Sequence, residues 1–321
     1  MNRREFMASA GALAFVAASS GMGFAQEFKQ LEFFVPAAPG GGWDQTARVM
    51  GDVLAKTGKI GNARFTNVGG AGGTIGLPQF VNQYKGKGDA LMVGGMVMVG
   101  AIITNKSPVD LSAVTPIARL TGEYLAVVVP ANSPIQTLAD LVEQLKKDVG
   151  SVSWAGGSAG GSDHILAGMI AKAVGVNPVD VAYVAFAGGG EALAAIMGGQ
   201  VTCGVSGWGE FSEQVAAGTL RVLAISAPER VEGIDAPTLK EQGVDVELLN
   251  WRAVFGAPGL SAEQTDTLVK LMSDMTETAE WKEELAKRSW TPLYLGGDEF
   301  AAYLKEDIER IRGILVDLGL A

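Results

Sequence analysis

The sequence has little of the two residue types that most often build covalent or metal-bound sites. It contains one cysteine, Cys203, and one histidine, His164. A single cysteine excludes an internal disulfide, and a single histidine excludes a multi-histidine metal site or a zinc cluster of cysteine and histidine. The apolar run 201–205 around Cys203 favours a small core residue over a nucleophile. Neither a metal ion nor any other cofactor is expected.

Positive charge is also scarce, with 25 Lys and Arg against 35 Asp and Glu and a formal net charge of −10. An acidic surface repels nucleic acids and anionic membranes, so neither is expected as a partner. Nucleotide-binding motifs are missing as well. There is no Gly-Lys-Ser/Thr phosphate loop, and the run 70–75 has Ile75 where a dinucleotide fingerprint needs its third glycine.

The N-terminus has the pattern of an export signal. Arg3 and Arg4 precede an apolar stretch over 8–24, which closes on the small residues around Ala25. This pattern predicts a twin-arginine signal peptide over residues 1–25. The alternative is a membrane anchor, but glycines and serines dilute the stretch below the roughly 20 apolar residues that a spanning helix needs. We therefore expect a periplasmic protein.

After the signal, short β-rich runs alternate with longer segments of helical period, separated by glycines. This alternation predicts an α/β fold with mostly parallel sheets and crossover helices. Strands are expected at 31–35, 64–68, 90–93, 125–129, 152–155, 181–184, 201–205, 220–225 and 253–256, and helices at 45–56, 138–147, 164–174, 191–197, 262–276 and 299–318.

No Pro-rich or Ser-rich linker divides the chain, so two domains would have to be joined by strands that cross between them. Such crossings are expected near 121–126 and 249–253. They would define one discontinuous domain, residues 28–122 plus 252–321, and one inserted domain, residues 123–251.

Glycine-rich turns follow several of the expected strands. The runs 36–44, 155–164 and 186–191 each lead from a strand into a helix. Glycines let a ligand approach the backbone closely, and a helix start directs unpaired N–H groups at it, so such turns are ready anion sites. Ligands in open α/β sheets bind beyond the carboxyl ends of strands, where these turns lie. A further turn at 69–73 could serve the same purpose or allow close packing, and packing is favoured there.

The sequence supports an enzyme less well than a binding protein. The run 156–160 matches the Gly-x-Ser-x-Gly elbow of α/β hydrolases, with Ser158 as nucleophile. However, His164 starts the helix that the elbow would launch and is badly placed to act as its base. Asp44 and Arg48, four residues apart, are best explained as a pair within one helix. A scaffold without ligand ranks between the binding protein and the hydrolase.

The motifs resemble those of the extracytoplasmic receptors of tripartite tricarboxylate transporters, also called the Bug family. The matching segments are the Pro-x-x-Pro-Gly-Gly-x-x-Asp turn at 36–44, the Gly-Ala-Gly-Gly segment at 67–76, the Gly-Ser-x-Gly-x-Ser-x-His-Leu turn at 157–166, and the runs 183–200 and 237–243. The likeness spans the whole mature chain.

The resemblance implies a two-domain, Venus-flytrap periplasmic binding protein and no enzyme. A monomer is expected to carry a small carboxylate to a two-component membrane permease. The resemblance places ligand-binding residues on three turns, namely Ala38, Gly41, Gly42, Trp43 and Asp44, then Ser158, Ala159, Gly160 and Ser162, and finally Gly188 and Gly189. The run 186–191 resembles the tricarboxylate-binding branch, so citrate is the first expected ligand. An aliphatic dicarboxylate, or an aromatic one stacked on Trp43, is the alternative.

Overall fold

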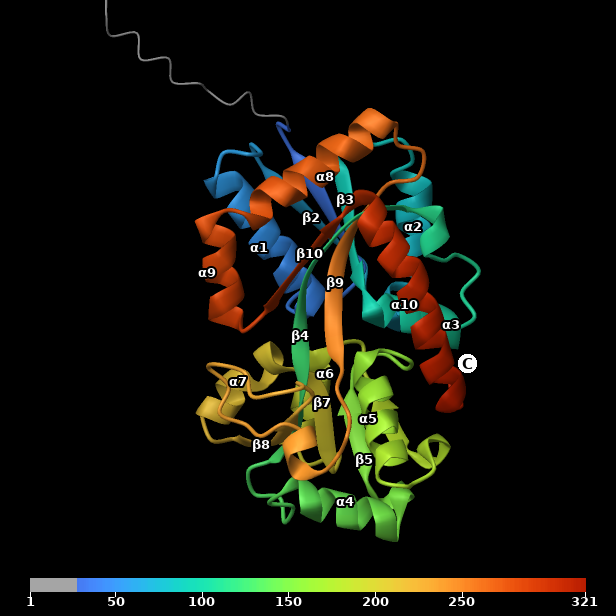
Figure 1. Ribbon diagram of the computed structural model, residues 1–321, viewed down its shortest axis with the longest axis vertical. Helices are drawn as coiled ribbons and strands as arrows, with labels where there is room; N and C mark the ends of the chain where they lie inside the picture. The colour runs from blue at the N-terminus through green and yellow to red at the C-terminus, as the bar shows by residue number, and fades with distance from the viewer. Residues whose placement is uncertain (1–27) are drawn as a thin grey trace, which may run out of the picture.

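The computed structural model describes residues 28–321, so the predicted signal peptide at 1–25 lies outside the described residues. The molecule is elongated, with two lobes stacked along its long axis and two long strands running between them (Figure 1). Within residues 28–321, no helix is both long enough and apolar enough to cross a bilayer.

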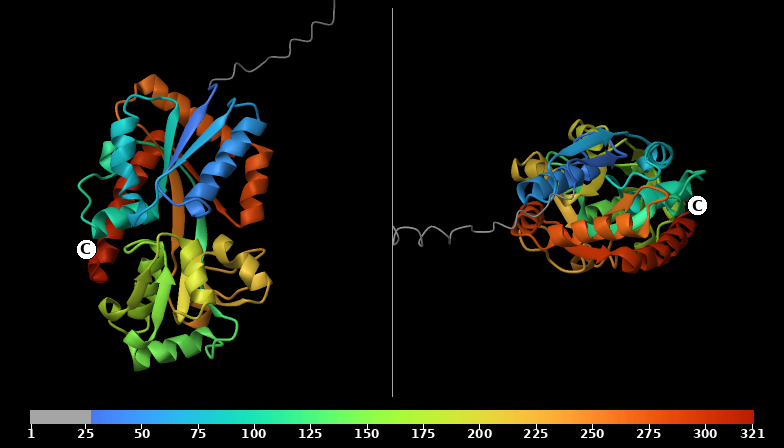
Figure 2. Two further views of the ribbon diagram at one scale, coloured as in Figure 1. Left: turned by 180° about the vertical axis from the view of Figure 1, so that it is seen from behind. Right: turned by 90° about the horizontal axis from the view of Figure 1, so that it is seen from above.

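The first lobe combines the start and the end of the chain (Figure 2). Its elements are β1 (Leu31–Val35), α1 (Gly42–Lys56), β2 (Ala63–Asn67), α2 (Gly76–Gln83), β3 (Ala90–Gly95), α3 (Met96–Thr104), α8 (Ala262–Thr276), α9 (Ala279–Arg288), β10 (Thr291–Gly296) and α10 (Gly297–Asp317). Strand β1 pairs in parallel with both β2 and β3. Helices cover both faces of this sheet, so β1 is almost entirely apolar and buried, as a parallel strand between helices requires.

The second lobe contains the middle of the chain. Its elements are α4 (Leu138–Lys147), β5 (Ser153–Gly156), α5 (Ser162–Ala173), β6 (Ala182–Ala185), α6 (Gly189–Met197), β7 (Cys203–Gly207), α7 (Trp208–Ala216) and β8 (Leu220–Ile225). Strand β5 pairs in parallel with β6 and β7. Helix α4 begins at a capping box in which Thr137 and Asp140 satisfy each other's backbone N–H groups.

Strands β4 (Thr115–Pro130) and β9 (Leu249–Gly256) connect the lobes. Up to Tyr124, β4 pairs antiparallel with β9 and β10, and from Leu125 it pairs antiparallel with β7 and β8. The sheet order β2-β1-β3-β9-β4-β7-β5-β6 is therefore continuous through both lobes. The predicted crossings at 121–126 and 249–253 lie on these two strands.

The α/β class predicted from the alternation is confirmed. The expected strands and helices are all present, with ends that differ by a few residues. Helices α2, α3, α7 and α9, strand β10 and the first half of β4 were not predicted. Two of these unpredicted elements, α7 and β4, contribute charged side chains to the cavity between the lobes.

Candidate functional site

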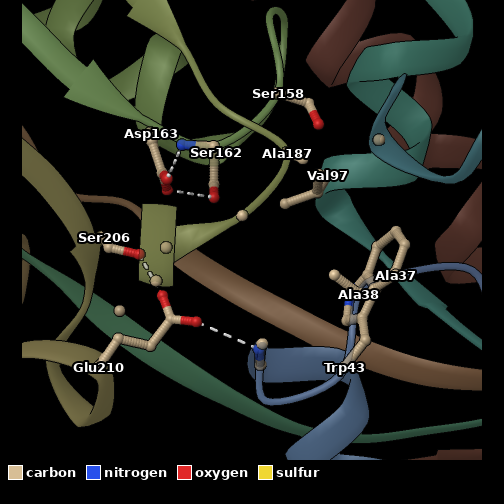
Figure 3. A pocket seen from close by; sticks show the side chains of 18 of the residues that line it. Ala37, Ala38, Trp43, Val97, Ser158, Ser162, Asp163, Ala187, Ser206 and Glu210 are labelled. Carbon is tan, nitrogen blue, oxygen red and sulfur yellow. Dashed lines mark hydrogen bonds between the residues drawn. The ribbon is translucent and has the colours of Figure 1, made fainter. Parts of the chain in front are cut away.

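A cavity of about 380 Å³ lies between the lobes, beyond the carboxyl ends of β1, β5, β6 and β7 (Figure 3). Its volume is in the range of small-molecule sites. The lining is formed by glycine-rich turns from both lobes and by polar side chains from β4, β7, α7 and β9.

Within residues 28–321, five helices begin at this cavity. Residues from the first turns of α1, α3, α5, α6 and α7 belong to its lining. The first N–H groups of a helix have no partner within that helix, and the helix dipole makes this end positive. Five such ends around one cavity favour an anionic ligand.

The turn between β1 and α1 forms one wall. Four of the five residues predicted there line the cavity: Ala38, Gly41, Gly42 and Trp43. Trp43 is 7% exposed, and its ring extends along the wall in the direction of Val97 (Figure 3). This wall therefore offers backbone N–H groups beside one aromatic surface.

The fifth predicted residue, Asp44, lies outside the lining and is buried behind the turn. Its carboxylate accepts hydrogen bonds from the Gly40 N–H at 2.8 Å, Arg48 Nε at 2.8 Å and Asn67 Nδ2 at 2.9 Å. Burial alone would raise the pKa of Asp44, but these hydrogen bonds lower it below its ordinary value. Asp44 thus stays ionised and holds the turn in place, and the predicted pair with Arg48 is present.

The turn between β5 and α5 forms the opposite wall. Ser158 and Ser162 line the cavity, whereas Ala159 and Gly160 lie outside its lining. The Ser158 hydroxyl adds a donor to the N–H groups at the start of α5, whereas the Ser162 hydroxyl donates to Asp163 Oδ1 at 2.9 Å.

His164 belongs to the framework of this turn. Its Nδ1 accepts the Gly160 N–H at 3.2 Å, and its ring stacks on Tyr183 with centroids 4.1 Å apart. Burial lowers the pKa of His164 to about 4, so the ring is neutral at physiological pH. These contacts fix the imidazole within its own turn and lend no support to a role as general base for Ser158.

The turn between β6 and α6 contributes Gly188 and Gly189, both predicted, together with Gly190. The Glu191 carboxylate accepts the Ala187 N–H at 3.2 Å and so braces the turn. Gly70, Gly72 and Gly73 also line the cavity. That turn, for which packing was favoured over a ligand site, therefore contributes to the lining as well.

Sequence reasoning missed the polar side chains at the base of the cavity. These are Glu123 on β4, Asp163 on α5, Ser206 on β7, Glu210 on α7, and Asn250 and Arg252 on β9. The available signal was a charged residue within an otherwise apolar strand, as with Arg252 between Trp251 and Ala253. Such a residue is rarely buried without a partner or a role.

Glu210 connects the two lobes. Its Oε1 accepts the Gly42 N–H, at the start of α1, at 3.1 Å, while its Oε2 accepts the Ser206 hydroxyl (Figure 3). A protein carboxylate thus binds the α1 N-terminus, one of the positive helix ends that face the cavity.

Glu123 and Arg252 form a buried ion pair between the neighbouring strands β4 and β9. Each side chain is only 3% exposed. Arg252 also donates to Thr46 Oγ1 at 3.3 Å and lies over the Trp290 ring. Its Nε, however, has no hydrogen-bond partner among residues 28–321, so one donor of this guanidinium is left unpaired.

Two carboxyl groups in this region, those of Asp163 and Glu123, have raised pKa values. Burial raises the pKa of Asp163 to about 7, although hydrogen bonds from the Gly157 N–H and the Ser162 hydroxyl favour the charged form. Burial likewise raises the pKa of Glu123, against the opposing effect of Arg252, and the nearby Glu210 raises it further. The base of the cavity thus carries excess negative charge that is partly relieved by protonation.

Residues 45–320 match the family described as the tripartite tricarboxylate transporter family receptor. The chain belongs to this family. The receptor is 26% identical to the "UPF0065 protein in gbd 5'region" of Cupriavidus necator, a match covering 100% of this chain and 99% of that protein. The family resemblance seen in the sequence is confirmed.

Solved structures confirm the fold. The periplasmic binding protein BugD matches with a TM-score of 0.81 at 21% identity, covering 91% of this receptor and 98% of that chain. MatC from Rhodopseudomonas palustris, with bound malate, matches with a TM-score of 0.76 at 22% identity, covering 89% and 99%. The receptor therefore has the predicted two-domain periplasmic binding protein fold.

Proposed function

We propose that this receptor captures a small carboxylate in the cavity between its lobes. It then delivers the ligand to a two-component permease of the tripartite tricarboxylate type. The supporting observation is that five helix N-termini and the hydroxyls of Ser158 and Ser162 meet at one cavity. The protein acts in the periplasm as a monomer, after export by its twin-arginine signal.

The available donors are sufficient for this function. A hydrogen bond to a charged group contributes about 1.5 to 3 kcal/mol, and a helix N-terminus contributes up to about 2 kcal/mol. Micromolar affinity needs about 8 kcal/mol net. Three or four well-placed donors from the turns that precede α1, α5 and α6, other than the Gly42 N–H that Glu210 occupies, would supply it.

The charge of the lining bears on which carboxylate binds. Four carboxyl side chains, Glu123, Asp163, Glu191 and Glu210, face one guanidinium, Arg252. Each additional negative charge on a ligand adds repulsion from these groups, which a partly buried cavity screens poorly. We therefore favour a ligand with fewer negative charges over citrate, and the malate bound to MatC is consistent with this choice. An aromatic dicarboxylate beside Trp43 is the second candidate.

Isothermal titration calorimetry of the purified protein tests the proposal. The panel contains citrate, malate, succinate, glutarate, aspartate, glutamate and terephthalate. We expect saturable binding of at least one member, weakened about tenfold by Ser158→Ala because a charge-assisted hydrogen bond is lost. Ser151→Ala, on an exposed turn outside the cavity, is the matched control. Absence of binding across the panel would refute the proposal.

A further inference from the structure

Some of the positive helix N-termini at the cavity are already bound by carboxyl side chains of the protein itself. Glu210 accepts the Gly42 N–H at the start of α1. Asp163, in the first turn of α5, accepts the Gly157 N–H and the Ser162 hydroxyl at 2.8 and 2.9 Å. A ligand that offered only carboxylates would meet these groups as competitors and as sources of repulsion.

The region around Gly42 concentrates this negative charge. Glu210 bonds to its N–H, and the Arg252 side chain lies so close that a Cβ on Gly42 would collide with it. Arg252 pairs with Glu123. The single guanidinium of Arg252 thus neutralises only one of two carboxylates, Glu123 and Glu210. A third carboxyl group, that of Asp163, is close enough for Glu210 to raise its pKa.

Asn250 supplies an independent indication of a ligand. It lines the cavity, is 7% exposed, and lies beside Glu123 in the β4–β9 register. Its Oδ1 has no hydrogen-bond partner among residues 28–321. A buried amide oxygen without a partner costs free energy, and the group that satisfies an oxygen is an N–H or O–H donor.

We propose that the ligand carries a protonated amino group in addition to its carboxylate, and that Glu210 is the residue that selects it. This rests on the proposed carboxylate-receptor function. The ligand carboxylate binds the N–H groups of the turn before α5 and the Ser158 hydroxyl, because Glu210 lies against Gly189 on the turn before α6. The ammonium group lies at the base of the cavity, where Glu210 accepts its hydrogen bonds and Asn250 adds an acceptor. The ligand class is therefore the small aminocarboxylates.

Matched ligand pairs test this selection. Aspartate with succinate, glutamate with glutarate, and 4-aminobutyrate with butyrate each differ only by the ammonium group. We expect calorimetry to show the amino member binding about tenfold or more tightly in at least one pair, the effect of one charge-assisted hydrogen bond. Equal or tighter binding of the members without an amino group would overturn the inference and leave the carboxylate function standing. Absence of binding by every member would overturn the inference alone, because citrate, malate and terephthalate in the first panel decide the carboxylate function.

Glu210→Gln identifies the selecting residue. Glutamine keeps the shape and can still accept the Gly42 N–H, but it removes the negative charge. We expect the preference for the amino ligand to fall about tenfold. Glu213→Gln, the same change on an exposed position of α7, should leave the preference unchanged. If Glu210→Gln instead raises the affinity for both members of a pair equally, Glu210 occupies the place of a ligand carboxylate and the inference fails.

The pH dependence of the unmodified protein gives a second readout that does not depend on a variant folding. The titratable and charged groups of the lining come from five elements: Glu123 on β4, Asp163 on α5, Glu191 on α6, Glu210 on α7 and Arg252 on β9. Tyr183 on β6 lies outside the lining, close to Asp163. Protons and a ligand ammonium both neutralise this cluster, so they compete.

Between about pH 6 and about pH 8, we expect the affinity for the amino ligand to rise and that for its partner without the amino group to fall, because the cluster loses protons. Parallel changes for both members of a pair would contradict the inference.

Discussion

Asp44 and Asp163 occupy equivalent places in the two lobes, yet their charge states differ. Each lies in the first turn of a helix that follows a glycine-rich turn, and each accepts the N–H of a preceding glycine at 2.8 Å. Asp44 then gains Arg48 and Asn67 as further donors, and its pKa is lowered. Asp163 gains only the Ser162 hydroxyl and is close to Glu210, and burial raises its pKa to about 7.

The comparison shows that a local motif positions a carboxylate but does not set its charge. Asp44 is stabilised as an anion and lies behind the wall of the cavity. Asp163 lies in the lining and holds a proton readily. The first lobe therefore presents mainly N–H groups to the ligand, whereas the second lobe presents N–H groups together with carboxyl groups.

Removing Arg252 should produce the largest effect. It pairs with Glu123 where both side chains are 3% exposed, and breaking a buried pair costs about 3 to 5 kcal/mol. We expect Arg252→Met to lower the free energy of unfolding by that amount near pH 8, measured by urea denaturation. The cost should be smaller near pH 5, where protonation of Glu123 removes the unpaired charge. Adding Glu123→Gln should recover part of the loss, and no recovery would mean that packing dominates.

Amide substitution at the two aspartates tests the comparison directly. Asparagine resembles a protonated aspartate and needs no proton, so Asp163→Asn should raise the free energy of unfolding at neutral pH or leave it unchanged. Asp44→Asn removes the charge that Arg48 neutralises and should cost about 2 to 3 kcal/mol. Urea unfolding of both variants measures the difference. Equal costs would contradict the assigned charge states.

The contributions of the two aspartates to the free energy of unfolding should also change with pH in opposite directions. Native Asp163 keeps its proton up to about pH 7, whereas the unfolded chain loses it near pH 4, so its stabilising contribution falls as pH rises between those values. Asp44 contributes above its unfolded pKa, and its contribution is lost as the pH falls through its lowered native pKa.

Asp163→Asn should therefore flatten the stability profile between about pH 4 and pH 7 by up to about 1.4 kcal/mol per pH unit. Asp44→Asn should flatten it only at lower pH. Thermal or urea unfolding over a pH series measures both profiles, and an unchanged slope in Asp163→Asn would refute the raised pKa.

The smallest expected effect concerns the turns themselves. Gly40 has φ +86°, and a Cβ there would meet nothing within 4 Å, so Gly40→Ala should cost about 1 kcal/mol through backbone strain alone. Gly188 has equal space but an extended backbone, with φ 179°. Gly188→Ala should therefore change stability by less than about 0.5 kcal/mol. Urea unfolding compares the two, and a similar cost at both would mean that conformation at Gly40 is not the constraint.

The sequence by itself determined the α/β class and the glycine turns that line the cavity. Both are local properties, because the hydrophobic period and the position of glycine are read over a few residues. The turns at Gly42, Ser158 and Gly189 could be predicted for this reason. Asp44 could be predicted as part of its motif, but its place behind the wall depends on Asn67, which comes from another strand.

Only the tertiary structure decided which charges face the ligand. Glu123 and Arg252 are 129 residues apart in the sequence, and Gly42 and Glu210 are 168 apart. The first half of β4 has a mixed polar sequence that does not read as a strand until β9 and β10 cover it on both sides. Helix α7 is short and starts directly after β7 without a capping side chain, so it lacked a start signal. The strength of a carboxylate's charge depends on burial and on distant neighbours, and those exist only once the chain has folded.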